Sequence, residues 1–128
     1  MNNIPIDLVI PIYNEGEKII KLFQEFNLNV KTKYRILLCY DNDDDNVFQQ
    51  KDKFKNFNFD IKLLKNPGVG PCSAVIEGLN YGGSECAIVY PADDFINFSI
   101  IDQMYEVFAD NNDIVVASRF MKGGSMKG

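Results

Sequence analysis

The stretch Val89-Tyr-Pro-Ala-Asp-Asp-Phe95 closes an apolar run with two adjacent carboxylates, Asp93 and Asp94. A short apolar run that is bounded by breakers predicts a buried strand. Carboxylates at the C-terminal end of such a strand lie where open α/β sheets bind ligands. Because neighbouring anions repel each other, a bound cation would account for the pair, and oxygen-only ligands favour Mg²⁺ or Mn²⁺. The alternative interpretation is that both aspartates begin a loop and cap the helix after it.

Apolar segments elsewhere in the chain predict strands that alternate with helices. Further strands are expected at 7–13, 35–40, 59–64 and 113–118, and helices after 17 and at 47–56, 72–81 and 99–108. Strands that are apolar throughout indicate a sheet covered on both faces, whereas the alternating segment 59–64 indicates a strand near an edge. The alternation therefore predicts an α/β fold, a Rossmann-like αβα sandwich with a mostly parallel sheet, in a single domain over residues 1–128.

The composition excludes several classes of function. The chain of 128 residues carries a net charge of −5 and no basic stripe, so nucleic acid is not an expected partner. It contains no histidine, which rules out Ser-His-Asp and Cys-His nucleophilic systems and every His-ligated metal site. Its three cysteines have no C-x-x-C spacing, which predicts reduced, mostly buried thiols in a cytoplasmic protein. Any chemistry must use carboxylates, hydroxyls, backbone amides and a bound cation.

Three of the predicted strands end in polar, mostly acidic clusters. These clusters are Tyr13-Asn-Glu15, Asp41 to Asp45, and Asp93-Asp94. Because the carboxyl ends of parallel strands meet at one edge of a sheet, residues far apart in the sequence are expected to converge into a ligand site. The alternative is that each cluster serves its own loop, since Asp and Asn are good turn formers.

Other candidates allow two interpretations each. Gly68 and Gly70 precede a predicted helix and could bring backbone amides to a phosphate, or could simply form a tight turn. Arg119, after the last predicted strand, could pair with a phosphate or with the acidic cluster. Tyr13 and Tyr40, at strand ends, could stack on a base or sugar, or pack in the core.

Taken together, these segments resemble a family 2 glycosyltransferase of the GT-A fold, in order and with matching spacing from about residue 6 to 124. The segments are Val9-Ile-Pro-Ile-Tyr-Asn-Glu15, similar to the family's first strand and turn; Tyr40-Asp-Asn-Asp-Asp-Asp45, in the place of its D-D-G-S-T-D loop; Asn66-Pro-Gly-Val-Gly70 with Ala74 and Gly78, like its N-x-G-x-G helix entry; Val89 to Phe95, in the place of its D-x-D motif; and Val116-Ala-Ser-Arg-Phe120 with Gly123-Gly124, like its later S-R…G-G segment.

The resemblance implies a nucleotide-diphospho-sugar donor and an unknown acceptor, which could be a lipid phosphate, a glycan or a protein. It implies that Pro11, Tyr13 and Glu15 border the base and ribose and that Asp41 contacts the base. Asp93 matches the last carboxylate of D-x-D, which holds Mg²⁺ or Mn²⁺ on the diphosphate. Such a cation neutralises charge on the departing nucleoside diphosphate while the complete enzyme transfers the sugar with inversion.

Some positions depart from the family pattern. Pro91 replaces the first Asp of D-x-D, Tyr40 replaces the first Asp of the loop, and residues 42–44 replace Gly-Ser-Thr. Asp94 is the candidate that compensates for Pro91 as a second metal ligand, and Gly70 completes the expected nucleotide site.

In this family the general base and acceptor site lie beyond the segment seen here, and no residue of this chain matches them. We therefore expect a donor-binding part that is truncated on its acceptor side and inactive alone. The expected location is the cytoplasm, with the full-length protein able to bind the cytoplasmic face of a membrane.

Two other functions remain open at this point. A sugar-1-phosphate nucleotidyltransferase would carry a Gly-rich, Lys/Arg-bearing loop after the first strand, where this chain has Asn14-Glu-Gly-Glu17. A nucleotide-binding module without catalysis is favoured by Pro91 and by the unmatched general base.

Overall fold

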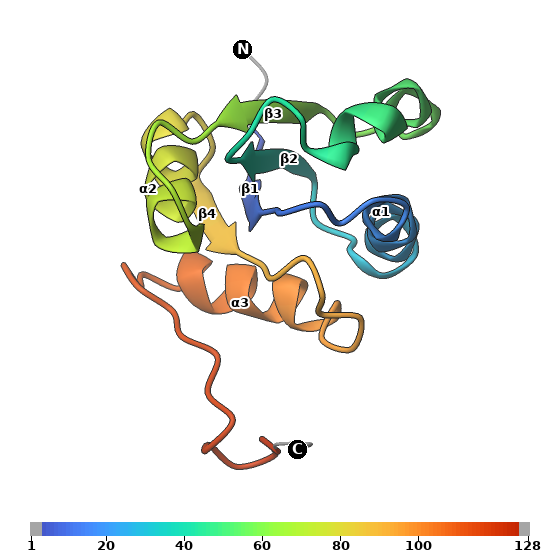
Figure 1. Ribbon diagram of the computed structural model, residues 1–128. Coiled ribbons are helices and arrows are strands. Elements are labelled where there is room, and N and C mark those ends of the chain that lie inside the picture. Colours follow the sequence, from blue (N-terminus) through green and yellow to red (C-terminus); the bar gives the residue numbers. More distant parts are fainter. Residues whose placement is uncertain (1–3, 126–128) are drawn as a thin grey trace.

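Four parallel strands form the sheet in the computed structural model, which describes residues 4–125 (Figure 1). The strands are β1 (Ile6–Pro11), β2 (Tyr34–Tyr40), β3 (Ile61–Lys65) and β4 (Cys86–Val89), and their spatial order is β3-β2-β1-β4. The register pairs Pro11 with Cys39 and Val9 with Val89, so the C-terminal ends of the central strands lie at one edge. The predicted parallel sheet and the edge position of β3 are confirmed.

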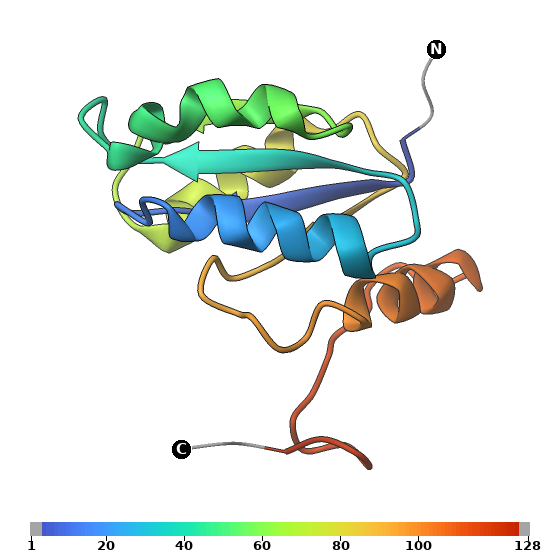
Figure 2. The ribbon, with the colours of Figure 1, turned by 90° about the vertical axis from the view of Figure 1, so that its right-hand side faces the viewer.

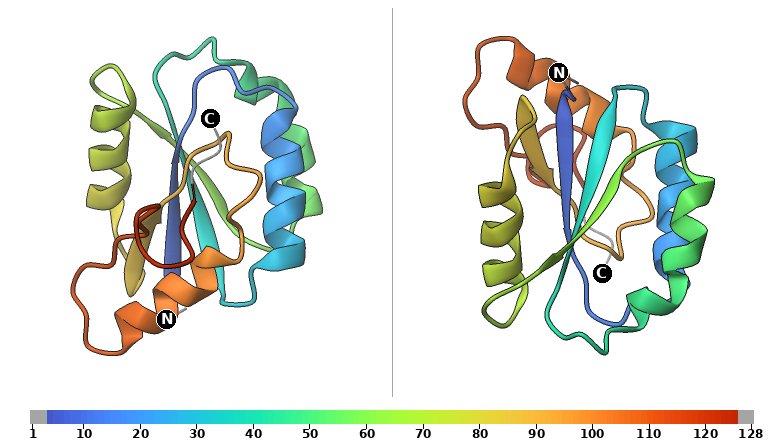
Figure 3. Two further views of the ribbon diagram at one scale, coloured as in Figure 1. Left: turned by 90° about the horizontal axis from the view of Figure 1, so that it is seen from below. Right: turned by 90° about the horizontal axis from the view of Figure 1, so that it is seen from above.

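Helices cover both faces of this sheet (Figures 2 and 3). The helix α1 (Lys18–Asn29) and the 3₁₀-helix η1 (Asn46–Asn56) lie on one face, and α2 (Pro71–Tyr81) lies on the other. The last helix, α3 (Ile100–Ala109), follows β4 and lies below the sheet in Figure 1. The αβα sandwich is therefore confirmed, although the predicted helix at 47–56 is of the 3₁₀ type.

Alternation along the central strands divides the core into two layers. Ile6, Leu8 and Ile10 of β1 pack in the larger cluster, which includes Phe23 and Phe26 of α1. On the opposite face, the smaller cluster contains Val9 of β1, Leu37 and Cys39 of β2, and Ala74 of α2. Because α2 covers the smaller cluster, its position depends on few side chains.

Gly78 allows α2 to lie close to the sheet. A Cβ atom at this position would lie 2.3 Å from Cγ1 of Val9 and 3.1 Å from Sγ of Cys39. The helix then ends at Gly82 and Gly83, which have φ angles of 62° and 106°. These are conformations that glycine adopts without a steric cost, and the predicted end of the helix at residue 81 is confirmed.

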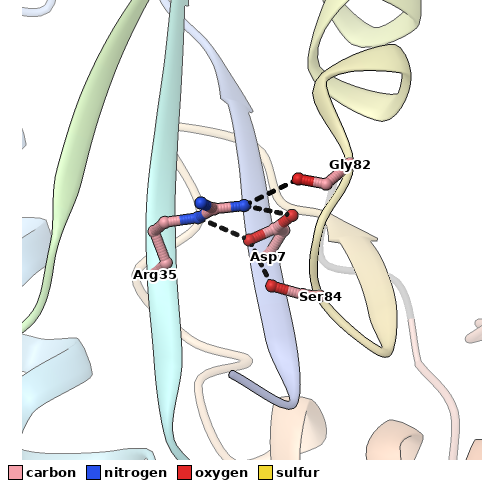
Figure 4. A network of polar contacts seen from close by, with 4 residues as sticks. All are labelled: Asp7, Arg35, Gly82 and Ser84. Atoms are coloured by element: carbon pink, nitrogen blue, oxygen red, sulfur yellow. Dashed lines mark hydrogen bonds and ion pairs between the residues drawn. The ribbon is translucent and has the colours of Figure 1, made fainter. Parts of the chain in front are cut away.

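A buried ion pair joins the sheet to the turn that follows α2 (Figure 4). Arg35 donates through Nε and Nη2 to the two carboxylate oxygens of Asp7, at 2.8 and 2.9 Å. The same Nη2 donates to the carbonyl of Gly82, and the Ser84 hydroxyl donates to Asp7. The network ties β1, β2 and the α2–β4 connection together on the α2 face of the sheet.

The predicted fifth strand is wrong. Residues 113–118 form no strand, and the side chains of Ile114 and Val116 are 84% and 76% exposed. An apolar, β-branched segment becomes a strand only when a neighbouring backbone pairs with it. Within residues 4–125 the sheet ends at β4, and this segment does not pair with the open edge of that strand.

The predicted burial of the cysteines also needs correction. Of the cysteines, only Cys39 is buried, Cys86 is intermediate, and Cys72 is exposed in the first turn of α2. Burial raises the pKa of the Cys39 thiol to about 11. Ser99 precedes α3 but makes no side-chain capping hydrogen bond, and Leu28 on α1 points to solvent.

Within the described residues, no helix is both long and apolar enough to cross a membrane.

Candidate functional site

A cavity of about 390 Å³ opens at the C-terminal edge of the sheet. It lies between the ends of β1 and β2 and the start of α2. All five residues that the sequence predicts for nucleotide binding line it, together with Ile12, Pro71 and Ala74: Pro11, Tyr13, Glu15, Asp41 and Gly70. Its volume falls within the range of small-molecule sites. The Tyr13 ring is 65% exposed, so it stands at the edge of the cavity.

Asp41 connects two walls of this cavity. Its Oδ1 accepts a hydrogen bond from Nδ2 of Asn66 at 2.7 Å, and its Oδ2 accepts one from the backbone N–H of Gly70 at 3.1 Å. Asp41 follows β2, whereas Gly70 directly precedes α2. The carboxylate therefore fixes the entry of the helix relative to the end of the strand.

The first two acidic clusters are also joined, as expected from the parallel sheet. Asp45 is buried and accepts from the backbone N–H of Asn14 at 3.0 Å and of Val47 at 2.8 Å. Asn46 accepts from Gly16 N–H and donates to the carbonyl and side-chain oxygens of Asn14. These contacts hold the turn that carries Tyr13 and Glu15 against the loop after β2. Sequence reasoning missed them, although Asp and Asn followed by a helix are typical of such turns.

The third cluster does not share this cavity. Pro91 and Asp94 line a separate cavity of about 840 Å³, together with Asn97 and the segment 117–125 that contains Ser118 and Arg119. The predicted meeting of the first two clusters is therefore confirmed, whereas the predicted convergence of the third cluster on the same cavity is wrong. Asp94 lines the second cavity, and Asp93 lines neither of the two.

Asp94 performs the loop-capping role that the sequence left as the alternative. Its Oδ1 accepts from the N–H groups of Ile96 and Asn97, at 2.9 and 3.0 Å, and its Oδ2 accepts from the Asn97 side chain at 2.8 Å. Partial burial disfavours the charged form, but these hydrogen bonds outweigh it and lower the pKa of Asp94. Asp93 is exposed, and its carboxylate has no hydrogen bond within residues 4–125.

The carboxylates at this position fit a cation that the protein binds with one or two side chains and that substrate phosphates also coordinate. In the described part of the chain, no group of three or more Cys, Asp or Glu side chains is close enough to enclose a metal ion. Mg²⁺ is commonly held by one or two carboxylates together with substrate phosphates. Asp93 fits that kind of site, with Asp94 available only through oxygens that already accept hydrogen bonds.

The glycines before α2 form a tight turn. Gly70 has a φ of 93°, and its N–H donates to Asp41, while the N–H of Gly68 donates to Oδ1 of Asn66 at 3.0 Å. Both amides are used inside the loop, which supports the turn interpretation over direct phosphate binding. Tyr40 packs against Phe48 with ring centroids 5.0 Å apart, so it belongs to the core.

A further cavity, of about 480 Å³, lies outside this site. Residues of the α1–β2 connection, Lys31 to Tyr34, line it together with Asn58 to Asp60 before β3. These segments precede β2 and β3, so the cavity lies at the opposite, N-terminal edge of the sheet. It contains none of the predicted site residues.

Comparison with known proteins agrees with the fold. The dolichol-phosphate mannosyltransferase of Pyrococcus furiosus is 25% identical over 124 residues, which are 95% of this chain and 35% of that protein. A crystal structure of S. aureus TarS matches 83% of this chain and 19% of its own, with a TM-score of 0.66 and 20% identity. A second TarS structure, of residues 1–349, matches 91% of this chain and 39% of its own, with a TM-score of 0.68 and 17% identity.

These matches cover a limited part of the other proteins. The chain spans about a third of the length of the curated relative. The sequence model described as "Glycosyl transferase family 2" matches residues 7–127, which is nearly the whole chain. That match extends from the first residues of β1 to beyond the last helix, and so includes both strand ends and the helix entry around the 390 Å³ cavity. The chain therefore belongs to glycosyl transferase family 2.

Proposed function

We propose that this chain binds the nucleoside part of a nucleotide-diphospho-sugar in the cavity at the ends of β1 and β2. The observation that carries the proposal is that Pro11, Tyr13, Glu15, Asp41 and Gly70, which come from three separate segments, line one cavity. An exposed aromatic ring at its edge and a carboxylate at its wall are suited to a base and its hydrogen-bond donors.

The diphosphate would extend from this cavity toward Asp93, where Mg²⁺ or Mn²⁺ would be held with phosphate oxygens. When bound, the cation neutralises the charge that develops on the departing nucleoside diphosphate. In the complete protein, a bond from an acceptor oxygen to the anomeric carbon would form as the bond to the diphosphate breaks, with inversion. The acceptor class would be a lipid phosphate, a glycan or a protein, at the cytoplasmic side of a membrane if it is a lipid.

The test is calorimetric titration of UDP and of GDP into the chain, in Mn²⁺ and in EDTA. We expect metal-dependent binding of one of them, and Tyr13→Ala should weaken it about tenfold, the scale of one base–aromatic stack. Leu28→Ala, a truncation of an exposed apolar side chain on α1, serves as the matched control. If a folded wild-type chain shows no heat of binding with either nucleotide, the proposal is contradicted.

A nucleotide-binding module without catalysis is the second candidate. It is favoured by Pro91 in the place of a carboxylate and by the hydrogen bonds that already occupy both oxygens of Asp94. The variant Asp93→Asn separates the two functions, because it should remove the effect of Mn²⁺ if Asp93 holds the cation. Binding that is equally strong in EDTA would favour the module. Family membership and the turn at 14–17 argue against the nucleotidyltransferase alternative.

A further inference from the structure

Asn66 is a buried polar residue at the base of the candidate site. It follows β3, is only 2% exposed, and does not line the cavity itself. Its Nδ2 donates to Oδ1 of Asp41 at 2.7 Å and to the carbonyl of Gly70 at 3.1 Å. Its Oδ1 accepts from the N–H of Gly68 at 3.0 Å and from the Ser73 hydroxyl at 2.6 Å. A carboxamide has two donor hydrogens and two principal acceptor positions, so its capacity is fully used.

Two of these partners, Asp41 and Gly70, line the cavity. They also bond to each other, because the N–H of Gly70 donates to Oδ2 of Asp41. The three residues thus form a closed ring of hydrogen bonds that comes from the end of β2, the end of β3 and the start of α2. A displacement of any one of them changes the distance between two walls of the cavity.

We propose that Asn66 is a positioning residue for nucleotide binding, and that it acts by holding the Asp41 carboxylate and the Gly70 turn in the binding geometry. The proposal rests on the proposed function of the cavity. Asn66 does not touch the ligand. It sets how Asp41 is oriented, and it does so from a buried position beneath the cavity.

The chemistry of the asparagine side chain explains why aspartate, a residue of similar shape, could not make the same hydrogen bonds at position 66. Asparagine and aspartate have nearly the same shape, but a carboxylate has no N–H to donate. In Asn66→Asp the introduced carboxylate would face Asp41 and would repel it. In Asn66→Ala all four hydrogen bonds are lost. The Gly70 N–H keeps its bond to Asp41, but the link that holds both residues to the end of β3 is removed.

The experiment is titration of UDP and GDP, with Mn²⁺, into the wild-type chain, Asn66→Asp, Asn66→Ala and the control Lys65→Met. Lys65 is the neighbouring residue and is exposed, and within residues 4–125 its one ion pair is with the exposed Asp43. We expect both Asn66 variants to bind at least about tenfold more weakly, the scale of one lost hydrogen bond to a charged group. Lys65→Met should bind like the wild type.

The pH dependence distinguishes positioning from a merely structural role. As the pH falls from about 8 to about 5, the two facing carboxyls of Asn66→Asp should come to share a proton, which restores one donor. Its deficit relative to the wild type should then shrink, whereas the deficit of Asn66→Ala should stay constant. Equal, pH-independent deficits in the two variants would overturn the proposal, as would wild-type affinity in Asn66→Ala.

Amide hydrogen exchange of the ligand-free chain separates failure of this inference from failure of the proposed function. We expect both Asn66 variants to exchange the N–H groups of Gly68 and Gly70 at least about tenfold faster, while the strand amides of β1 and β2 keep their protection. If the wild type binds neither nucleotide, the proposed function fails and exchange still decides whether Asn66 holds the loop. Unchanged exchange at Gly68 and Gly70 would contradict the hydrogen-bond role directly.

Discussion

At the scale of single residues, several carboxylates of this acidic chain serve as acceptors for backbone amides. Asp45 holds the turn after β1, Asp94 holds the turn after β4, and Asp102 of α3 holds the turn after α1. In each case the side chain replaces a backbone partner that irregular segments lack. A carboxylate accepts such bonds better when it is ionised, so the turns held by Asp94 and Asp102, whose pKa values are lowered, depend on pH.

Acid should therefore destabilise the chain through Asp94 and Asp102. Hydrogen bonds from Thr32 and the amides of Lys31 and Thr32 outweigh the effect of burial and lower the pKa of Asp102. A lowered folded-state pKa contributes stability above the unfolded value, near 4, that is lost as the pH falls through the folded value. In urea unfolding between about pH 6 and pH 2, Asp102→Asn should lower the midpoint at pH 6 and flatten the acid loss.

The control for this experiment is Gln103→Ala, which changes the adjacent exposed residue of α3 without removing a titrating group. It should keep the wild-type dependence on pH. An Asp102→Asn profile that runs parallel to the wild type over the acid range would contradict the role of this carboxylate.

The Asp7–Arg35 pair should contribute far more than the exposed pair of Lys65 and Asp43. Asp7 is 2% exposed and Arg35 is 15% exposed, and the hydrogen bond from Arg35 to Asp7 raises the pKa of the guanidinium. Removing one partner leaves a buried charge unpaired, so Arg35→Met should lower the free energy of unfolding by about 3–5 kcal/mol. Asp43→Asn, the matched control, should leave the urea midpoint close to that of the wild type.

A double-mutant cycle tests whether the loss comes from the pair itself. Asp7→Asn together with Arg35→Met should cost clearly less than the sum of the two single losses, because each single variant leaves the other group unpaired. Simple additivity in urea unfolding would show that the two side chains stabilise the fold independently.

At the scale of secondary-structure elements, the position of α2 determines the shape of the cavity. The helix begins at Pro71, beside Asp41, and its middle rests on β1 and β2 at Gly78. Close helix–sheet contact at Gly78 and a hydrogen-bonded turn at the start of the helix leave α2 little freedom to move. The sequence signal for this arrangement, a small residue in the middle of a helix, is weak on its own.

Gly78→Ala tests this contact. The added Cβ would lie 2.3 Å from Cγ1 of Val9, so the helix or the strand must move, and we expect a loss of about 1–3 kcal/mol in the free energy of unfolding. Asn80→Ala, at an exposed position of the same helix, is the control. The double variant with Val9→Ala should recover part of the loss, and no recovery would mean that the cost arises elsewhere.

A helix or strand could be predicted from the sequence wherever the residues within that segment determine its secondary structure. The apolar strands β1, β2 and β4, the helices between them and the glycine stop after α2 follow from local pattern and turn chemistry. The segment 113–118 has the same pattern but forms no strand, because pairing depends on a neighbour that local sequence does not reveal.

The candidate site shows the same limit. The parallel order brings Pro11, Tyr13 and Asp41 to one edge, which the sequence predicts, and their role in binding a nucleotide stays a prediction. The partners of Asn66 could not be predicted, because they come from two strand ends and a helix start whose spacing is set by tertiary packing. For the same reason, the sequence could not decide whether Asp94 serves the loop or a cation.

At the scale of the whole molecule, the net negative charge opposes association between chains, whereas the exposed apolar surface favours it. The strand β4 is at the edge of the described sheet, and its Val89 is 46% exposed. The segment after α3 adds Ile114 and Val116, and residues 113–115 share a cavity with the β4 residues 86–88. An exposed, apolar strand edge without charged side chains is a common site of association between chains.

We therefore expect this chain to self-associate reversibly as its concentration rises, in spite of its net charge of −5. Sedimentation velocity over a range of concentrations should show an increasing average mass, and more so at high salt, which screens the repulsion.

Replacing Ile114 and Val116 together by lysine should reduce association while leaving the urea midpoint unchanged, because both side chains lie outside the core. The control, a double replacement of the exposed Gln24 on α1 and Gln103 on α3 by lysine, changes the net charge equally without removing apolar surface, and it should not reduce association because it lowers the net negative charge. If the control reduces association as strongly as the replacement of Ile114 and Val116, the apolar segment does not govern the association.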